Sequence, residues 1–219
     1  MSLLLREESQ GRKALLTRNL APGRKVYNED LVLRGGVEYR TWDPFRSKLA
    51  AAIIKGLRDD TIREGSKVLY LGASTGTTLS HVSDLVGPSG LVVGVEFAPR
   101  VAREFVENVA RERKNVIPFV ADARDPSKYS VANFDVVYCD IAQPDQTEIA
   151  LANCSKLLKK GGALFLVVKA RSIDVLKDPG QVFNEERRKL EREGYRVEAV
   201  IELSPFDKDH ALILAEARS

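Results

Sequence analysis

Short apolar runs alternate with helical patterns from residue 67 onward, and this alternation constrains the fold more than any other feature of the sequence. Strand–helix alternation is typical of a doubly wound parallel sheet with helices on both faces. The pattern predicts strands over residues 67–71, 91–96, 116–120, 135–140 and 163–169. It predicts helices over residues 77–86, 99–113, 146–160 and 179–193, the third of them ended by Gly161 and Gly162.

Two further strands, over residues 196–203 and 210–216, end the chain. Only six residues separate them, and a parallel crossover needs a dozen or more, so they must form an antiparallel pair. By analogy at the level of fold, seven strands with a terminal antiparallel hairpin are the Rossmann-like α/β layout of class I S-adenosylmethionine-dependent methyltransferases. Turn signals between short β-type runs predict a small N-terminal β-rich domain over residues 1–45, followed by the methyltransferase domain over 46–219.

Composition excludes several classes of protein. Hydrophobic residues make up 44% and charged residues 30% of the 219 residues, which is typical of a globular chain. No apolar run is long enough to span a bilayer, and the start lacks the apolar core of a signal peptide, so we expect a cytoplasmic protein without a membrane partner. Cys139 and Cys154 follow no metal-ligand spacing, and we expect both to be buried, reduced thiols and the protein to hold no metal.

The net charge of +3 comes from the N-terminal part of the chain, where residues 1–60 hold 12 Lys and Arg against 8 Asp and Glu. A solvated surface explains this excess about as well as a surface that faces RNA. The bias is weak, so we expect poor affinity for RNA and little activity without partners.

Two successive strands of the predicted parallel sheet, over residues 135–140 and 163–169, end in charged residues. Asp140 follows the apolar run 134–139, and Lys169 ends the run 163–168. The carboxyl ends of parallel strands meet at the edge where open α/β sheets bind ligands. A lysine there is costly unless it is paired or takes part in chemistry, so the pair indicates an enzyme. The structural alternatives are a helix N-cap for Asp140 and a strand-end lysine reaching into solvent for Lys169.

A glycine-rich turn and two acids predict a cofactor site at the same edge. Gly72 and Gly76 lie in a turn of small residues, where they let the backbone approach a ligand closely. The turn lacks the middle glycine of a dinucleotide fingerprint and the Gly-Lys-Ser/Thr of a P-loop. Glu96 ends the next strand and can accept hydrogen bonds from both hydroxyls of a ribose, although a helix-capping role would also explain it. Asp122 follows the third strand, where it can reach an adenine amino group.

The chain resembles the fibrillarins, in particular their archaeal members, over nearly its whole length. The matching segments are residues 38–51, 72–87, 140–144 and 205–211. The Gly/Arg-rich arm of the eukaryotic members is absent, and Ser74-Thr75 replaces the Ala-Ser pair of many members. The resemblance implies methylation of ribose 2′-hydroxyls of pre-rRNA, and also of tRNA, with S-adenosylmethionine as the methyl donor.

The resemblance also implies partners and site residues. The partners are a box C/D guide RNA, a Nop-family scaffold protein and a kink-turn-binding protein of ribosomal type, in an archaeal cell. A catalytic Lys-Asp-Lys-His constellation maps onto Lys48, Asp140, Lys169 and His210. Together with the glycine turn, the predicted cofactor contacts are Gly72, Ala73, Gly76, Thr77, Thr78, Glu96, Phe97, Asp122, Ala123, Asp140, Ile141, Ala142 and Gln143.

Chemistry supports these roles independently. A ribose 2′-hydroxyl is a weak nucleophile, and its proton must leave as the methyl group arrives. A neighbouring positive charge favours the neutral form of a lysine, so Lys169 can act as the base while Lys48 orients the oxygen and stabilises developing charge. Asp140 would hold the lysine and balance charge beside the sulfonium. Whether Lys169 takes the proton or only positions the hydroxyl stays open at this point.

Three alternative functions fit the sequence less well. The terminal hairpin and the glycine turn disfavour a nicotinamide-dependent oxidoreductase. A catalytically weak RNA–protein scaffold with an S-adenosylmethionine-binding fold would not need Lys48, Asp140 and Lys169. A small-molecule methyltransferase would not need a basic N-terminal unit. The second histidine, His81, is interpreted as a packing or capping residue, because the sequence supplies no partner for it.

Overall fold

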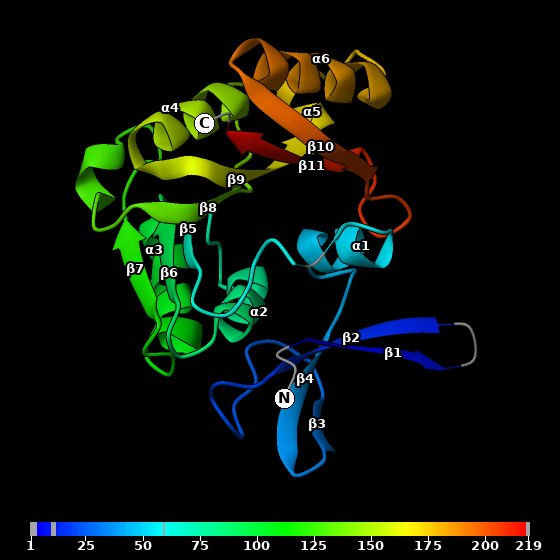
Figure 1. Ribbon diagram of the computed structural model, residues 1–219, viewed down its shortest axis with the longest axis vertical. Coiled ribbons are helices and arrows are strands. Elements are labelled where there is room, and N and C mark those ends of the chain that lie inside the picture. Colours follow the sequence, from blue (N-terminus) through cyan, green and yellow to red (C-terminus); the bar gives the residue numbers. More distant parts are fainter. Residues whose placement is uncertain (1–3, 10–11, 59, 218–219) are drawn as a thin grey trace.

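The computed structural model describes residues 4–9, 12–58 and 60–217, which form two β-sheets (Figure 1). The smaller sheet is antiparallel, with strand order β1-β2-β4-β3, and lies below the larger one in Figure 1. Its early position along the chain agrees with the predicted N-terminal β unit, while the division at residue 45 stays a prediction. Its strands are β1 (Leu4–Ser9), β2 (Arg12–Arg18), β3 (Leu31–Arg34) and β4 (Val37–Trp42).

The larger sheet has seven strands in the order β10-β11-β9-β8-β5-β6-β7. Five of them pair in parallel, and β11 runs antiparallel to both β9 and β10. The predicted α/β class, a mostly parallel seven-stranded sheet with a terminal antiparallel hairpin, is therefore confirmed. The strands are β5 (Lys67–Leu71), β6 (Leu91–Glu96), β7 (Val116–Val120), β8 (Phe134–Cys139), β9 (Leu158–Lys169), β10 (Tyr195–Glu202) and β11 (His210–Ala217).

Helices cover both faces of the seven-stranded sheet, and the apolar residues of its central strands alternate between the two resulting cores. On β5, Val68 and Tyr70 pack toward one face and Leu69 and Leu71 toward the other. Burial of both faces explains why these strands are continuous apolar runs. One face holds α1 (Lys48–Ile54), α2 (Thr77–Val86) and α3 (Pro99–Phe105), and the other holds α4 (Gln146–Leu157), α5 (Ala170–Ile173) and α6 (Pro179–Arg192).

Two helices differ from the sequence prediction. The helix predicted over residues 146–160 ends at Leu157, and Gly161 and Gly162 lie inside β9 instead of ending the helix. Leu158 is already extended because it pairs with Phe134 of β8. The helix predicted over 99–113 ends at Phe105 and continues as a π-helical turn, η1 (Val106–Ala110). Both predictions were wrong at their C-terminal ends, because helical periodicity does not show where a neighbouring element changes the backbone. The pattern also missed a short 3-10 helix, η2 (Pro126–Tyr129).

A buried ionic network attaches the small sheet to α2. Arg40 of β4 is fully buried, and its guanidinium lies 3.0 Å from a carboxylate oxygen of Glu29 and 3.2 Å from one of Asp84. Asp84, on α2, also pairs with Arg113. Buried charges are tolerated only when they are paired in this way, so the network fixes how the small sheet sits against the larger unit.

His81 of α2 belongs to the same interface and has partners that the sequence did not suggest. Its Nδ1 lies 2.7 Å from the hydroxyl of Thr17, and its Nε2 lies 2.7 Å from the hydroxyl of Tyr27. Its ring stacks on Trp42 with 4.9 Å between ring centroids. Burial, together with the charges of Arg40 and Arg113, lowers the pKa of His81 well below its usual value. The packing role is confirmed, and the view that nothing partners this histidine was wrong.

Both cysteines are free and buried, as predicted. Burial is the main cause that raises the pKa of Cys139 and of Cys154 to about 12, so neither is a reactive thiolate at neutral pH. None of the helices within the described ranges has the length and apolar character needed to cross a membrane.

Candidate active site

The predicted site residues meet where the parallel strands of the larger sheet end. A cavity of about 330 Å³ lies at this edge, within the range typical of small-molecule sites. Ala73, Gly76, Thr77 and Thr78 follow β5 in the turn and the start of α2 but do not line the cavity, and as cofactor contacts they stay predictions. The lining includes nine other predicted cofactor contacts: Gly72, Glu96, Phe97, Asp122, Ala123, Asp140, Ile141, Ala142 and Gln143.

The glycine turn after β5 has no room for a side chain at Gly72. This residue has a φ of +83°, and a Cβ there would lie 2.7 Å from the carbonyl oxygen of Asp140. Gly76 has a different requirement: its Cβ would lie 2.5 Å from Cγ2 of Val109 on η1. The first glycine therefore brings the turn against the end of β8, and the second lets α2 pack on the neighbouring helix.

Glu96 holds the glycine turn and keeps acceptor capacity toward the cavity. Its two carboxylate oxygens accept hydrogen bonds of 2.9 Å from the backbone N–H groups of Ser74 and Ala98. Ala98 is the N-cap of α3, so the helix-capping alternative describes part of its role. A carboxylate has about four lone-pair sites, so each oxygen can still accept a hydrogen bond from a ligand hydroxyl.

Several residues of the cavity were not singled out from the sequence. Arg124 is the most informative of them, because its guanidinium lies 2.8 Å from Asp145 and donates a 3.2 Å hydrogen bond to the amide oxygen of Gln143. These contacts join the loop after β7 to the loop after β8. The only signal in the sequence is the position of Arg124 two residues after Asp122, whose carboxylate accepts from its N–H. The other lining residues that were missed are Ser74, Val95, Ala121 and Ile149, and Lys169 lines the cavity as well.

Three of the four predicted catalytic residues form one contact cluster. Lys169, the last residue of β9, places its ammonium 2.8 Å from Oδ1 of Asp140 and 2.9 Å from the Asp140 carbonyl oxygen. Lys48, the first residue of α1, places its ammonium 3.3 Å from Oδ2 of the same carboxylate. The side chains of Lys48, Asp140 and Lys169 are 23%, 12% and 16% exposed, so all three can be reached from solvent while being largely buried.

His210, the fourth residue, joins the cluster through an acid that sequence reasoning did not assign to the site. Its Nδ1 lies 2.9 Å from Oδ1 of Asp207, whose Oδ2 lies 3.7 Å from the ammonium of Lys48. The hydrogen bond to Asp207 raises the pKa of His210 above its usual value, against the opposing effect of burial. Burial alone would raise the pKa of Asp207, but the hydrogen bond from His210 and the charges of His210, Lys48 and Lys169 hold it below its usual value.

The position of Lys48 is set by a hydrogen-bond relay from α2. Ser47 is the N-cap of α1, and its hydroxyl accepts from the N–H of Ala50. The hydroxyl of Thr78 donates a 3.0 Å hydrogen bond to the Ser47 hydroxyl. Thr78 thus connects the helix after the glycine turn to the start of the helix that carries Lys48.

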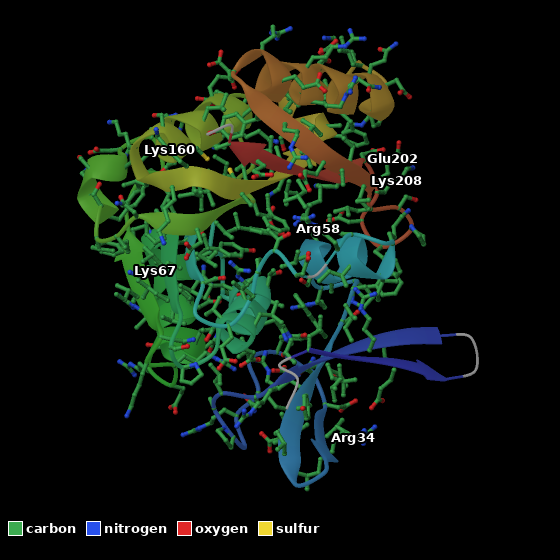
Figure 2. The ribbon with its side chains drawn as sticks, in the orientation of Figure 1. Arg34, Arg58, Lys67, Lys160, Glu202 and Lys208 are labelled. Atoms are coloured by element: carbon green, nitrogen blue, oxygen red, sulfur yellow. The ribbon has the colours of Figure 1, made fainter. Side chains whose placement is uncertain are left out.

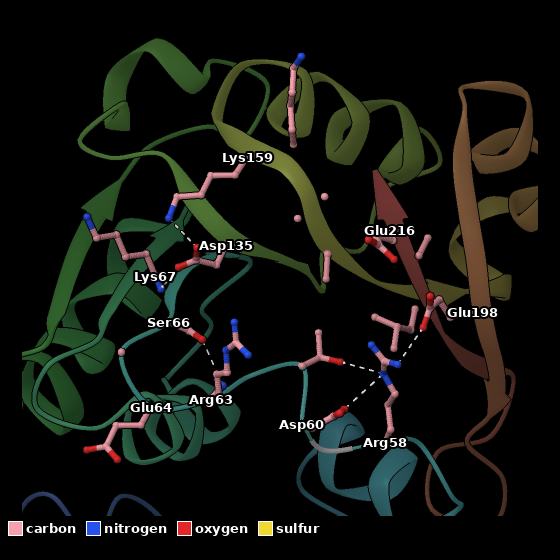
Figure 3. A pocket seen from close by; sticks show the side chains of 18 residues that line it. Arg58, Asp60, Arg63, Glu64, Ser66, Lys67, Asp135, Lys159, Glu198 and Glu216 are labelled. Atoms are coloured by element: carbon pink, nitrogen blue, oxygen red, sulfur yellow. Dashed lines mark hydrogen bonds and ion pairs between the residues drawn. The ribbon is translucent and has the colours of Figure 1, made fainter. Parts of the chain in front are cut away.

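A larger cavity of about 600 Å³ lies at the opposite edge, where the parallel strands begin (Figure 3). Most of its acids are paired with cations: for example, Asp135 lies 2.6 Å from Lys159, and Glu198 lies 3.3 Å from Arg58. Figure 3 shows these pairs on the cavity wall. The described residues of its lining include no histidine, no cysteine and none of the predicted site residues, so we place the chemistry at the smaller cavity.

The two parts of the smaller site are continuous, because Asp140 and Lys169 both line the cavity and belong to the lysine cluster. A ligand in the cavity would therefore meet, at Asp140, a second molecule held by the two lysines. The cavity offers backbone groups that Gly72 allows to come close, and the carboxylates of Glu96 and Asp122. These donors and acceptors suit the amino-acid and adenosine parts of S-adenosylmethionine.

Comparison with known proteins agrees with this interpretation. The sequence model of the family described as fibrillarin matches residues 3–219. A fibrillarin-like rRNA/tRNA 2′-O-methyltransferase of Sulfolobus acidocaldarius is 53% identical over 210 residues, covering 95% of this chain and 90% of that protein. The structure of Aeropyrum pernix fibrillarin with natively bound S-adenosyl-L-methionine is 42% identical, with a TM-score of 0.86 over 98% of this chain and all of that one. A chain of a fibrillarin/Nop5p complex is 39% identical, with a TM-score of 0.84 and 94% of each chain covered.

Proposed function

The chain belongs to the fibrillarin family, and from this premise we propose that it is an S-adenosylmethionine-dependent RNA ribose 2′-O-methyltransferase acting on rRNA and tRNA. One observation carries the proposal: two lysines hold opposite oxygens of Asp140 at the mouth of the cofactor cavity. A scaffold without catalysis would not need two lysines on one carboxylate, because a single lysine would already pair the charge of Asp140.

S-adenosylmethionine supplies an electrophilic methyl group on a positively charged sulfur. Glu96 would accept hydrogen bonds from its ribose hydroxyls, and Asp122 would accept one from its adenine amino group. Gly72 would let the backbone approach the ligand, and the Asp140 carboxylate, which lines the cavity, would balance the positive sulfur. These assignments rest on the lining of the cavity and on the Aeropyrum pernix relative, which holds this cofactor natively.

We assign the proton of the ribose 2′-hydroxyl to Lys169. One carboxylate faces two ammonium groups in this site, and the bound cofactor adds a third positive charge. In the proposed step the amine of Lys169 accepts the hydroxyl proton as the methyl group moves from sulfur to the 2′-oxygen. Lys48 remains charged, orients the 2′-oxygen and stabilises the negative charge that develops on it. Alignment of the oxygen, methyl group and sulfur then supplies much of the rate.

His210 and Asp207 act on the side of Lys48. The Asp207 carboxylate contacts both the imidazole and the Lys48 ammonium, so it holds Lys48 between two acids. His210 Nδ1 is engaged by Asp207 and by the carbonyl oxygen of Lys208. In the proposed reaction this pair keeps Lys48 charged and oriented, while Lys169 carries the proton.

Partners complete the proposed function. A Nop-family protein is the first, since a relative of this chain was solved in complex with Nop5p. We further propose that a box C/D guide RNA selects the nucleotide and that a kink-turn-binding protein of ribosomal type organises the guide. A cytoplasmic place of action in an archaeal cell is part of the same proposal, supported by the archaeal relatives.

The test is methyl transfer in a complex reconstituted from this chain, a Nop-family protein, a kink-turn-binding protein and a guide RNA. Labelled methyl groups are expected on the guided nucleotide of the substrate and not on a substrate with a 2′-deoxy nucleotide at that position. Equal labelling of both substrates would contradict ribose methylation. For the base, Lys169→Arg is expected to abolish turnover, and near-normal turnover with an unchanged pH–rate profile would exclude that role.

A further inference from the structure

Two phenylalanines lie beside the lysine cluster on segments that carry its residues. Phe45 precedes Lys48 by three residues, and Phe206 is the neighbour of Asp207. Their rings meet edge to face, with 5.1 Å between centroids and 71° between planes. Phe45 is nevertheless 67% exposed, while Phe206 is half-buried against the core beneath α1. An exposed ring is thus supported from one side and open on the other.

The backbone that carries Phe45 is held in place. Its N–H donates a 2.8 Å hydrogen bond to the Asp43 carboxylate, and the N–H of Arg46 donates to the Asp43 carbonyl oxygen. The loop that carries Phe206 is fixed as well, because the N–H groups of Phe206 and Asp207 both donate to the carbonyl oxygen of Leu203. The exposed aromatic surface is therefore preorganised.

Each phenylalanine has a cation close to it in the chain: Arg46 follows Phe45, and Lys208 lies two residues after Phe206. Arg46 is exposed and lies over the ring of Tyr27, with 6.0 Å to its centroid, and Lys208 is exposed on the loop between β10 and β11 (Figure 2). Among the side chains that the structure describes, no carboxylate pairs with either Arg46 or Lys208. A solvent-exposed aromatic ring near cations without a carboxylate partner is typical of surfaces that bind single-stranded nucleic acid. The ring stacks on bases, and the cations contact phosphates.

We propose that Phe45, supported by Phe206, forms a nucleobase-stacking subsite for the substrate RNA, with Arg46 and Lys208 contacting the phosphates on either side. This inference rests on the proposed function, which brings an RNA ribose to Lys48 and Lys169. A protein partner is disfavoured as the occupant, because it would cover the approach to Lys48 and Asp207, where the ribose must enter. The subsite would hold the strand in register while the lysines position the 2′-hydroxyl.

The test compares Phe45→Ala with the wild type in the reconstituted complex, using substrates in which single nucleotides near the target are abasic. Phe45→Ala is expected to raise the substrate concentration for half-maximal rate about tenfold, and Phe45→Trp to restore it. Leu33→Ala is the matched control, because Leu33 is 69% exposed and lies on the small sheet. At one position of the substrate, an abasic nucleotide should raise the substrate concentration for half-maximal rate of the wild type about tenfold. The same abasic nucleotide should cause no further rise for Phe45→Ala.

The cations are tested by salt dependence. Arg46→Gln and Lys208→Gln are each expected to reduce the slope of log affinity against log salt by about 1. Lys160→Gln, on the other side of the larger unit from Lys208 in Figure 2, should leave the slope unchanged.

Three results would overturn the subsite. In the first, Phe45→Ala and Leu33→Ala have the same substrate concentration for half-maximal rate. In the second, every abasic nucleotide weakens substrate binding equally in Phe45→Ala and in the wild type. In the third, Phe45→Ala loses binding to the Nop-family protein while its response to abasic substrates is unchanged. The last result would make the pair a protein contact. Methyl transfer by the wild type tests the proposed function separately. If it fails, photo-crosslinking of 5-iodouridine RNA in the same complex still decides: a cross-link to Phe45 supports the subsite, and cross-links found only elsewhere reject it.

Discussion

His210 lies directly opposite Lys169, as its register partner across the antiparallel strands β11 and β9. The chain thus returns from β10 through a short loop and places an imidazole beside the end of the strand that carries the proposed base. The same loop supplies Asp207, which contacts both His210 and Lys48. The terminal hairpin therefore does more than complete the sheet, because it builds the side of the site that faces Lys48.

Asp140→Asn is expected to reduce methyl transfer by about 100-fold or more, because it removes the carboxylate that both lysines contact. The rate is measured under single-turnover conditions in the reconstituted complex. Asp135→Asn is the control at the opposite end of the same strand, where the carboxylate pairs with Lys159 away from the smaller cavity. Similar losses in both variants would mean that the effect comes from damage to β8.

Thr78→Val is expected to lower kcat about three- to tenfold while leaving the affinity for S-adenosylmethionine unchanged, because Thr78 bonds to the N-cap of the Lys48 helix. Calorimetry of cofactor binding and turnover of the complex give the two readouts. A parallel loss of cofactor affinity would instead support the direct cofactor contact that the family resemblance implies.

Gly72→Ala is expected to weaken S-adenosylmethionine binding at least about tenfold, because its Cβ would displace the carbonyl oxygen of Asp140, which accepts from Lys169. Gly56→Ala is the matched control: Gly56 also has a positive φ, of +105°, but a Cβ there meets nothing within 4 Å. Calorimetry of both variants separates backbone strain from the clash. Unchanged binding by Gly72→Ala would show that the turn can move away from β8.

Stability should depend on pH through His210 and Asp207. Because the pKa of His210 is raised in the folded state, this residue adds to the free energy of unfolding. The added stability is complete below the ordinary pKa of 6.5 and is lost as the pH rises through the raised pKa of the folded state. The lowered pKa of Asp207 gives a contribution that is present above its ordinary value of 3.8 and is lost as pH falls through the lowered value. The pair therefore stabilises the fold most between these two ordinary values.

The check is the free energy of unfolding of the wild type and His210→Gln at about pH 5.5 and about pH 9. The difference should be below about 1 kcal/mol, because both side chains are partly exposed, and larger at the lower pH. Asp207→Asn should show at least this loss, because it also removes the contact with Lys48, and the double variant should lose no more than Asp207→Asn alone. A difference that grows toward pH 9 would contradict the assignment.

Arg40→Ala is expected to destabilise the protein by about 3–5 kcal/mol, because it leaves the buried carboxylates of Glu29 and Asp84 without this partner. Arg34→Ala, which breaks an exposed pair with Glu7 in the same small sheet, should leave stability nearly unchanged. Chemical denaturation of both variants gives the comparison. Equal effects would mean that the Arg40 network does not hold the small sheet on α2.

The sequence by itself determined the layers of the fold and three of the strand ends that form the site. Periodicity located β5, β6 and β7 at their observed bounds, and the six-residue linker required the antiparallel hairpin. Periodicity did not predict that the helix ends at Leu157 and that β9 begins at Leu158. Whether a residue after a helix is extended depends on the neighbouring strand with which it pairs.

Only the tertiary structure decided which charges meet. Lys48 and Asp140 are 92 residues apart, and nothing local connects them, since their contact depends on how α1 packs across the end of β8. The partners of His81, the role of Asp207 and the relay from Thr78 to Ser47 have the same origin. Strand and helix periods follow from local backbone geometry, which the sequence encodes residue by residue. Side-chain contacts across elements depend on packing distances, which exist only once the chain has folded.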